Sequence, residues 1–513
     1  MSIHNDEKGL IQNMKNKKAI LNTLFGILLG ALSGLAFMLA FPPYEIWPLI
    51  FIGWIPVLVA QNRIMPPKLS SLPTAIAIGI WLEGYMGPVF RPTGSYMIYL
   101  PLIAAVISFV VDLGKRKFNQ LTHYRWFVLE GAITWAGMEM IRLFIPIAGT
   151  WGFIAYPLYR QTWFIQPASI FGIIGQGVLI MVINQALALG IIFWMDRGRD
   201  LTGETTIAPK TVSRWAYATG IALILWTALS LALFQPAVAP TVTVAAIQPE
   251  ISPIITGNRG EEDLLAVIHQ NMIDQTREAA DQGAEFIVWP EGAMLFDPQV
   301  EDNLNLTGLA EELGIHLAVG YVVILENGTF RNEATVIDPS GEFLGVFGKD
   351  HPVLFGGETS PTRGTYPVYD TSLGVLGTII CYDLDYTDTA RKLAAQGVQL
   401  IGVPSNDWGA IADKHYTHVV FRAIENRVAM VKADGGYDSA IVDPYGQIKA
   451  LAVHPKGGGA TLVADVLLGS GRGTLNTRLG DWVGWLGLAG IVFFTFGSSY
   501  LIKTAQKKEQ DGL

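Results

Sequence analysis

The stretch "LGVLGTIICYDLDYTDTARKLAAQGVQLIGVPSND" (373–407) decides the class of the fold. An apolar, β-branched run ends at Cys381, a segment with helical spacing follows, and a second apolar run leads to a polar end. Strand, helix and strand in succession are typical of an α/β domain. The same alternation begins with "TVTVAAIQPE" (241–250) and a helical pattern over 261–283. We therefore predict an α/β domain over residues 240–473.

Three reactive residues share one kind of position, at the end of a predicted strand or the start of its loop. Glu291 follows "IVWP", Lys349 follows "GVFG" and Cys381 follows "GTII". Loops at strand ends commonly carry the chemistry of α/β proteins. A carboxylate can take the proton of a thiol, and an ammonium can stabilise the thiolate and then an oxyanion, with the backbone N–H of Tyr382 as second donor. Together they predict acyl transfer through a thioester.

Taken singly, each residue has an ordinary structural explanation. Cys381 is the only cysteine, and a cysteine on an apolar strand is most often a packing residue. A loop glutamate or lysine is most often solvated. The matching settings of all three favour a site. Cysteine and histidine clusters with metal spacing are absent from the sequence, so we expect neither a metal nor a cofactor.

The composition indicates a membrane protein. Of 513 residues, 50% are hydrophobic and only 15% are charged, whereas soluble domains carry about 25% charge. The formal net charge of −9 and the lack of a basic stripe argue against nucleic-acid binding.

Apolar runs of the length that a bilayer requires, about 20 residues, occur before and after the α/β domain. We expect seven helices within residues 1–239 and one within 474–513, followed by a tail. The predicted spans lie near 19–41, 46–60, 73–90, 94–113, 126–148, 169–194, 216–235 and 482–502. We expect the first run to be retained as an anchor and not removed as a signal peptide, because it is long enough to span the bilayer and further spans follow.

The positions of lysine and arginine predict the sidedness. With a cytoplasmic N-terminus, seventeen fall in inside segments and two, Arg91 and Arg160, in short outside loops. We therefore expect a multi-pass protein of the cytoplasmic (inner) membrane, with both termini in the cytoplasm and the α/β domain on the periplasmic or extracellular side.

Three further features allow alternative interpretations. Glu139 and Arg142 lie three residues apart in the fifth span and form either a structural ion pair or a contact for a lipid headgroup or the external domain. The aromatic loop 149–164 is either an interfacial belt or the lining of a lipid path. The Gly-, Pro- and Thr-rich segment 354–367 is a candidate lid.

The motifs resemble those of a known superfamily and of one membrane-bound family within it. "VWPEGA", "FGKDHPVLFGGE" and "IICYD" resemble the Glu, Lys and Cys motifs of the nitrilase superfamily. The segments "LAFPPYEIWPLIFIGWIPVLVA" and "TLNTRLGDWVGWLG", with "EMIR" in the fifth span, resemble the apolipoprotein N-acyltransferase family over nearly the whole chain.

The resemblance implies an α-β-β-α sandwich joined to a helical membrane bundle. It implies Glu291 as general base, Lys349 as oxyanion stabiliser and Cys381 as nucleophile. The implied reaction is ping-pong transfer of an acyl chain from a membrane phospholipid to the N-terminal amine of a diacylglyceryl apolipoprotein. We expect the protein to act as a monomer.

The sequence departs from the family pattern around these residues. Glu358 lies nine residues after Lys349, one more than the usual spacing of the supporting glutamate, and we expect it to fill that role. Asp383 stands where the family commonly has glutamate, beside Tyr382, and we expect both residues to support the site.

Other functions fit parts of the same pattern. A membrane-anchored amidase would use the same three residues with water as the acceptor. A non-catalytic lipid- or lipoprotein-binding protein would keep the domain without the chemistry. A transporter has little support beyond the Glu139 and Arg142 pair.

Overall fold

The computed structural model describes residues 2–91, 96–197, 205–234, 240–353, 357–359 and 362–510. The chain forms two compact units. The bundle unit comprises Met1–Met140, Gly177–Trp226 and Gly484–Leu513, and the sandwich unit comprises Ile141–Gln176 and Thr227–Val483.

Helices dominate the bundle unit, and some of them continue into the sandwich unit. They are α1 (Ser2–Ala40), α2 (Ile55–Val59), α3 (Leu72–Phe90), α4 (Leu100–Val111), α5 (Lys115–Leu121), α6 (Phe127–Leu143), α7 (Ala168–Asp196), α8 (Pro209–Leu233) and α15 (Trp482–Gln510). Short 3₁₀ or π turns lie at Trp47–Phe51, Ala60–Ile64, Pro67–Leu69 and Tyr96–Tyr99.

Within the described residues, six helical segments are long and apolar enough to cross a membrane. They are Asn16–Ala40, Trp47–Ile64, Met97–Leu121, Ala168–Asp196, Pro209–Leu233 and Trp482–Ala505. The predicted spans at 73–90 and 126–148 form α3 and α6, but the 17 residues of α6 reach only about 26 Å, less than a bilayer core. Residues 94, 95 and 235 of the predicted spans lie outside the described part of the chain.

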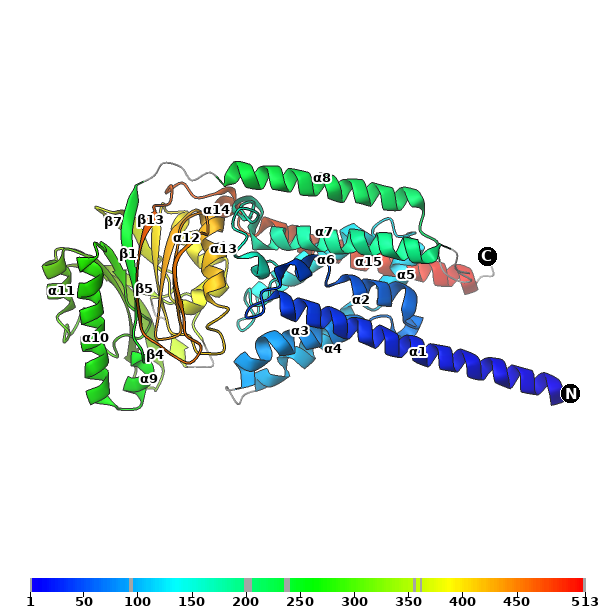
Figure 1. The fold of residues 1–513 in the computed structure, drawn as a ribbon, viewed down its shortest axis with the longest axis horizontal. Coiled ribbons are helices and arrows are strands. Elements are labelled where there is room, and N and C mark those ends of the chain that lie inside the picture. Colours follow the sequence, from blue (N-terminus) through cyan, green and yellow to red (C-terminus); the bar gives the residue numbers. More distant parts are fainter. Residues whose placement is uncertain are drawn as a thin grey trace. The chain divides into compact units, whose positions relative to one another are not determined.

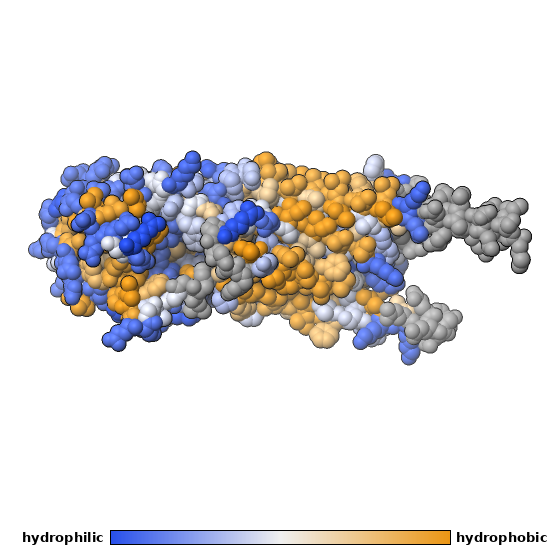
Figure 2. Space-filling model, turned by 90° about the horizontal axis from the view of Figure 1, so that it is seen from below, coloured by the Kyte–Doolittle hydropathy of each residue, from blue (hydrophilic) through white to orange (hydrophobic). Residues whose placement is uncertain are grey.

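Apolar surface identifies the bundle unit as the membrane part. Figure 2 shows orange, hydrophobic side chains over its helices and mostly blue, hydrophilic side chains over the sandwich unit. Inside the bundle, α1 and α3 approach closely: a Cβ on Gly30 would lie 2.7 Å from the carbonyl oxygen of Pro73, and one on Gly34 would lie 2.7 Å from that of Ala77. Glycines on α1 therefore allow the two backbones to meet.

Two β-sheets form the centre of the sandwich unit. The first has the order β13-β1-β2-β3-β4-β5, with β6 paired to β4, and the second has the order β12-β11-β10-β9-β8-β7. The strands are β1 (Thr241–Gln248), β2 (Phe286–Val288), β3 (His316–Ile324), β4 (Phe330–Ile337), β5 (Phe343–Gly348), β6 (Glu358–Thr359), β7 (Tyr369–Thr371), β8 (Gly374–Thr378), β9 (Leu400–Ser405), β10 (Ala429–Asp434), β11 (Asp438–Val442), β12 (Ile448–Val453) and β13 (Ala460–Leu467).

Helices cover the outer faces of both sheets (Figure 1). They are α9 (Pro253–Asn258), α10 (Glu262–Asp281) and α11 (Leu306–Leu313) on the first sheet, α12 (Asp388–Ala394) and α13 (Tyr416–Asn426) on the second, and the short α14 (Leu475–Leu479) beside α13. One apolar core lies between the sheets and another lies between the first sheet and α10 and α11. The predicted α-β-β-α sandwich with a helical membrane bundle is therefore confirmed.

Parallel strands, one in each sheet, lead to two of the predicted site residues. Strands β1, β2 and β3 run parallel, as do β8, β9 and β10. Glu291 follows the carboxyl end of β2, and Cys381 follows that of β8. Parallel strands present their carboxyl ends at one edge, where loop residues can converge.

Candidate active site

Lys349 follows the last residue of β5, and its ammonium lies between two carboxylates. Its Nζ is 2.8 Å from Glu291 Oε1 and 3.0 Å from Glu358 Oε1. Asn332 of β4 donates its side-chain amide to the same two oxygens, at 2.6 and 3.2 Å. Lys349 is 1% exposed and Glu291 is 5% exposed. The structure thus brings Glu291, Lys349 and Glu358 into one buried cluster, and it adds Asn332, which no sequence signal marked.

Glu291 is held where the first sheet meets the second. Its backbone N–H donates to the carbonyl oxygen of Ser405 on β9, at 3.2 Å. On β3, a Cβ at Gly320 would lie 2.9 Å from the Cα of Glu291. Only glycine at this position allows the Glu291 segment to lie this close to the strand.

Cys381 opens a short 3₁₀ helix, η8 (Cys381–Asp385), three residues beyond the end of β8. Its φ is 41°, in the left-handed region that non-glycine residues seldom adopt. Asp383 holds this turn, since one carboxylate oxygen accepts the N–H of Ile380 at 3.0 Å. Such strained positions persist where the surrounding structure enforces them, often at functional sites.

Electrostatics keep the thiol protonated at rest. Burial raises the pKa of Cys381 well above its usual value, and the carboxylates of Glu291 and Asp407 raise it further, while Lys349 opposes them. Burial also raises the pKa of Glu291, with Lys349 opposing the shift. Burial disfavours the Lys349 charge, but the Glu291 and Glu358 carboxylates outweigh it and raise its pKa well above the usual range. The cluster therefore contains a stable cation and a carboxylate whose affinity for a proton is raised.

The loop after Cys381 is anchored by both supporting residues predicted there. The hydroxyl of Tyr382 donates to the carbonyl oxygen of Pro146 at 2.8 Å, and that of Tyr386 donates to the same oxygen at 2.7 Å. Asp383 is fully buried and accepts the backbone N–H of His351 at 2.8 Å. Asp383 therefore holds the turn from inside.

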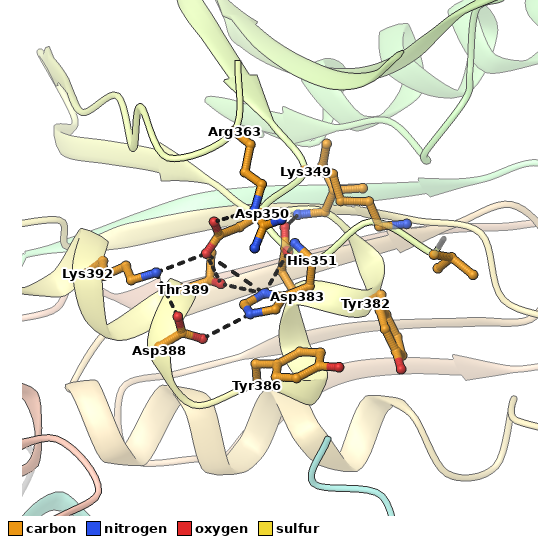
Figure 3. A network of polar contacts seen from close by, with 12 residues as sticks. Lys349, Asp350, His351, Arg363, Tyr382, Asp383, Tyr386, Asp388, Thr389 and Lys392 are labelled. Atoms are coloured by element: carbon orange, nitrogen blue, oxygen red, sulfur yellow. Dashed lines mark hydrogen bonds and ion pairs between the residues drawn. The ribbon is translucent and has the colours of Figure 1, made fainter. Parts of the chain in front are cut away.

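His351 connects the end of β5 to this loop (Figure 3). Its ring is parallel to the Tyr386 ring, with centroids 3.8 Å apart. Burial would lower the pKa of His351, but Asp383, Asp388 and Asp350 outweigh this and raise it. These carboxylates therefore favour the charged form of the imidazole, which attracts the turn that contains Asp383.

A lysine occupies the space between the acidic residues of this network. Nζ of Lys392 lies 3.1 Å from Asp350 and 2.6 Å from Asp388, as the dashed lines of Figure 3 show. Asp350, His351 and Asp388 lie near enough to one another to share an ion. Because the Lys392 ammonium already bridges both carboxylates, this arrangement is an ion-pair network.

The Cys381 thiol also contacts a second buried cluster of charged side chains. Cys381 Sγ lies 3.6 Å from Asp407 Oδ1, in the loop after β9. His415 Nδ1 lies 2.7 Å from Asp407 Oδ2, and His415 Nε2 lies 3.3 Å from Asp385 Oδ1. Lys432 Nζ lies 2.9 Å from Asp407 Oδ2. The sequence interpretation missed this cluster, although "SNDWGAIADKHYTH" places its acidic and imidazole groups close together in the chain.

The aromatic loop packs within the sandwich unit. Trp151 Nε1 donates to Asp385 Oδ2 at 2.7 Å, and the Tyr159 hydroxyl lies 2.8 Å from that of Tyr416. Trp151, Tyr156 and Tyr159 are buried, whereas Trp163 is 42% exposed. Three of these aromatic side chains therefore help to build the unit that carries Cys381. Residues 354–356, 360 and 361 of the candidate lid lie outside the described part of the chain.

Two family models match the chain. Residues 33–186 match the N-terminal domain of apolipoprotein N-acyltransferase, and residues 243–474 match the carbon-nitrogen hydrolase model. The two matches do not overlap, and the carbon-nitrogen hydrolase match includes strands of both sheets of the sandwich. Membrane and hydrolase parts therefore occur here in the order that the resemblance predicted.

Known relatives align over most of the chain. The apolipoprotein N-acyltransferase of Geobacter metallireducens is 27% identical over 511 residues, covering 90% of this chain and 93% of that protein. The one of Borreliella burgdorferi is 23% identical over 499 residues, covering 88% and 92%. A solved amidase from Nesterenkonia sp. is 20% identical over 44% of this chain and 90% of its own, with a TM-score of 0.36. From the family models and the full-length relatives, the chain belongs to the apolipoprotein N-acyltransferase family of membrane enzymes.

Proposed function

We propose that this protein transfers a fatty acyl chain from a membrane phospholipid to the N-terminal amine of a diacylglyceryl-cysteine apolipoprotein, through a thioester on Cys381. The observation that carries the proposal is the buried ion pair between Glu291 and Lys349, 2.8 Å long, whose charges act on the only thiol of the chain. Membership of the acyltransferase family supports a lipid donor and a lipoprotein acceptor.

In the first half-reaction, Cys381 Sγ attacks the ester carbonyl of the phospholipid while Glu291 accepts the thiol proton. Lys349 and the backbone N–H of Tyr382 stabilise the oxyanion of the tetrahedral intermediate. The ester C–O bond then breaks, and Glu291 returns the proton to the glycerol oxygen. The products are the acyl-enzyme and a lysophospholipid.

In the second half-reaction, the neutral amine of the apolipoprotein attacks the thioester carbonyl and gives a proton to Glu291. The C–S bond breaks, an amide forms, and the proton returns to Sγ. Glu358 and Asn332 support both steps, because they hold Lys349 and Glu291 in place within 3.2 Å.

We also propose that the sandwich unit lies outside the cytoplasmic membrane and that both termini are cytoplasmic. The excess of lysine and arginine in the loops on the N-terminal side supports this orientation. The same orientation places the site on the face where exported lipoproteins and phospholipids meet. We propose a monomer, since one chain supplies every residue of the site.

The test uses full-length protein in phospholipid vesicles with a diacylglyceryl-cysteine peptide as acceptor. Cys381→Ala is expected to abolish peptide acylation and to lose the acyl adduct in the intact mass of the protein. Glu312→Gln, at an exposed carboxylate of α11, serves as the matched surface control and is expected to retain both.

The outcomes separate the remaining candidates. Full acylation by Cys381→Ala would overturn the proposal. Release of free fatty acid without acylated peptide would indicate the amidase alternative, in which water is the acceptor. A native protein that forms no acyl adduct at all would indicate a binding protein without catalysis.

A further inference from the structure

The second cluster places a cation close to the thiol. Ligand-type atoms of Cys381, Asp407 and His415 all lie within 4.8 Å of one another. The thiol lies 3.6 Å from Asp407 Oδ1, and the His415 ring bridges Asp407 and Asp385. All four side chains are 9% exposed or less, so water screens these charges weakly.

Asp407 needs His415 because the neighbouring lysine is shared. Lys432 Nζ lies 2.9 Å from Asp407, 2.9 Å from Asp438 and 3.6 Å from Asp434. One ammonium therefore faces three carboxyl groups. Burial raises the pKa of Asp434 and of Asp438, whereas His415 and Lys432 together outweigh burial at Asp407, the carboxylate that faces Cys381, and hold its pKa well below the usual value.

The charged and titratable groups around this cluster come from several elements. They are Cys381 and Asp385 of η8, His418 of α13, Lys432 and Asp434 of β10, and Asp438 of β11, with Glu291 and Lys349 facing the thiol. The ring of Trp151 is stacked on that of His415, with centroids 5.6 Å apart.

The two histidines of this region, His415 and His418, differ in protonation. Burial would lower the pKa of His415, but Asp407 and Asp385 outweigh it and raise it to about 9. Burial lowers the pKa of His418 to about 4, although Asp385 opposes the shift. At neutral pH, His415 is therefore a cation and His418 is neutral, while both rings lie beside Asp385.

We propose that His415 is a positioning residue for acyl transfer: its imidazolium, fixed by Asp385, neutralises the Asp407 carboxylate beside Cys381 and so allows the thiol to give up its proton. This inference rests on the proposed role of Cys381 as nucleophile. Asp407 accepts the S–H of the resting thiol and would repel the thiolate if its own charge were unbalanced. His415 acts through Asp407 and does not touch substrate.

The test is the pH dependence of Cys381 alkylation by iodoacetamide in the full-length, detergent-solubilised protein. Since Cys381 is the only cysteine, all label reports this thiol. An opposite charge within about 4–6 Å shifts a pKa by about 1–3 units, so His415→Gln is expected to move the alkylation midpoint upward by about one unit or more. Asp407→Asn is expected to move it downward.

Matched variants separate this role from a structural one. His418→Gln removes a neutral ring that also lies beside Asp385, and it is expected to leave the midpoint unchanged. His415→Lys keeps a cation and is expected to restore the midpoint of the parent protein. Equal shifts in His415→Gln and His418→Gln, or no shift in His415→Gln, would overturn the inference.

The parent protein provides a test that needs no substitution. Its alkylation rate is expected to rise less steeply near pH 9, where His415 loses its charge. A single ionisation with no change of slope there would contradict the inference, even if the variants fail to fold. Because alkylation requires no acyl donor, its result is independent of whether acyl transfer itself is demonstrated.

Discussion

Two clusters around Cys381 share a pattern but differ in protonation. In one, the Lys349 ammonium lies between Glu291 and Glu358, and in the other the His415 imidazolium lies between Asp407 and Asp385. The pKa of Glu291 is raised by burial. Burial would also raise the pKa of Asp407, but His415 and Lys432 hold it well below its usual value.

Glu291 and Asp407 contact different numbers of cations. Glu291 and Glu358 share one cation, whereas Asp407 meets both His415 and Lys432. A carboxylate with a raised pKa is a stronger base than one with a strongly lowered pKa. This difference supports the proposal that Glu291 is the base, and it favours an electrostatic role for Asp407.

The largest expected effect comes from removing Glu291, the proposed base. Glu291→Gln keeps the size of the side chain but removes the proton acceptor, so the rate of acyl transfer to a diacylglyceryl peptide is expected to fall by roughly 10²–10⁴-fold. Cys381 should remain open to alkylation. Activity within a few-fold of the parent protein would mean that another group, such as Asp407, takes the proton.

Removing the shared cation is expected to cost somewhat less. Lys349→Met should lower the transfer rate by about 10²–10³-fold through loss of an oxyanion donor. Because Lys349 lowers the pKa of Glu291, the fall of activity at acidic pH should also begin at a higher pH in the variant. The measurement is a pH–rate profile with residual activity, and Lys449→Met on the exposed end of β12 is the matched control. If activity falls at the same acidic pH in the variant as in the parent protein, the fall does not report protonation of Glu291.

The third prediction concerns the contribution of Asp385, in the second cluster, to the stability of the fold. Burial would raise its pKa, but His415 and His418 lower it to about 2, from the usual 3.8. A depressed pKa adds stability above pH 3.8 that is lost as the pH falls through 2, and the shift corresponds to about 2 kcal/mol. Asp385→Asn should therefore lower the free energy of unfolding by about that amount at pH 7, measured by denaturant titration. The difference should shrink below pH 4; a constant difference would indicate lost packing.

The smallest expected effect concerns His351, whose partly exposed ring faces three carboxylates. Its folded pKa is raised, so its charge adds stability below the unfolded pKa of about 6.5, and this stability is lost as the pH rises through the folded value. His351→Gln should lower the free energy of unfolding, measured by denaturant titration, more at pH 6 than at pH 9, and the two losses should differ by under about 1 kcal/mol. Asp370→Asn, at an exposed carboxylate of β7, is the control for charge removal. The same loss at both pH values would argue that the ring contributes only by stacking on Tyr386.

Local pattern in the sequence predicted much of the molecule. Apolar length indicated the membrane helices, and strand–helix alternation indicated the α/β domain. Glu291, Lys349 and Cys381 could be singled out because each follows a predicted strand, and their roles remain predictions. Chain-local periodicity is sufficient for these inferences because helices and strands have fixed repeats of 3.6 and 2 residues.

Only the tertiary structure decided what surrounds the thiol. The contacts of Asn332 with Glu291, of His415 with Asp385, and of Trp151 with Asp385 join parts of the chain that are separated in sequence, by 234 residues in the last case. A single sequence does not encode such meetings in any local repeat, because sheet order and strand register bring them about. The sequence by itself thus determined the helices, the strands and the candidate nucleophile, while tertiary packing determined which charged groups lie close to that thiol.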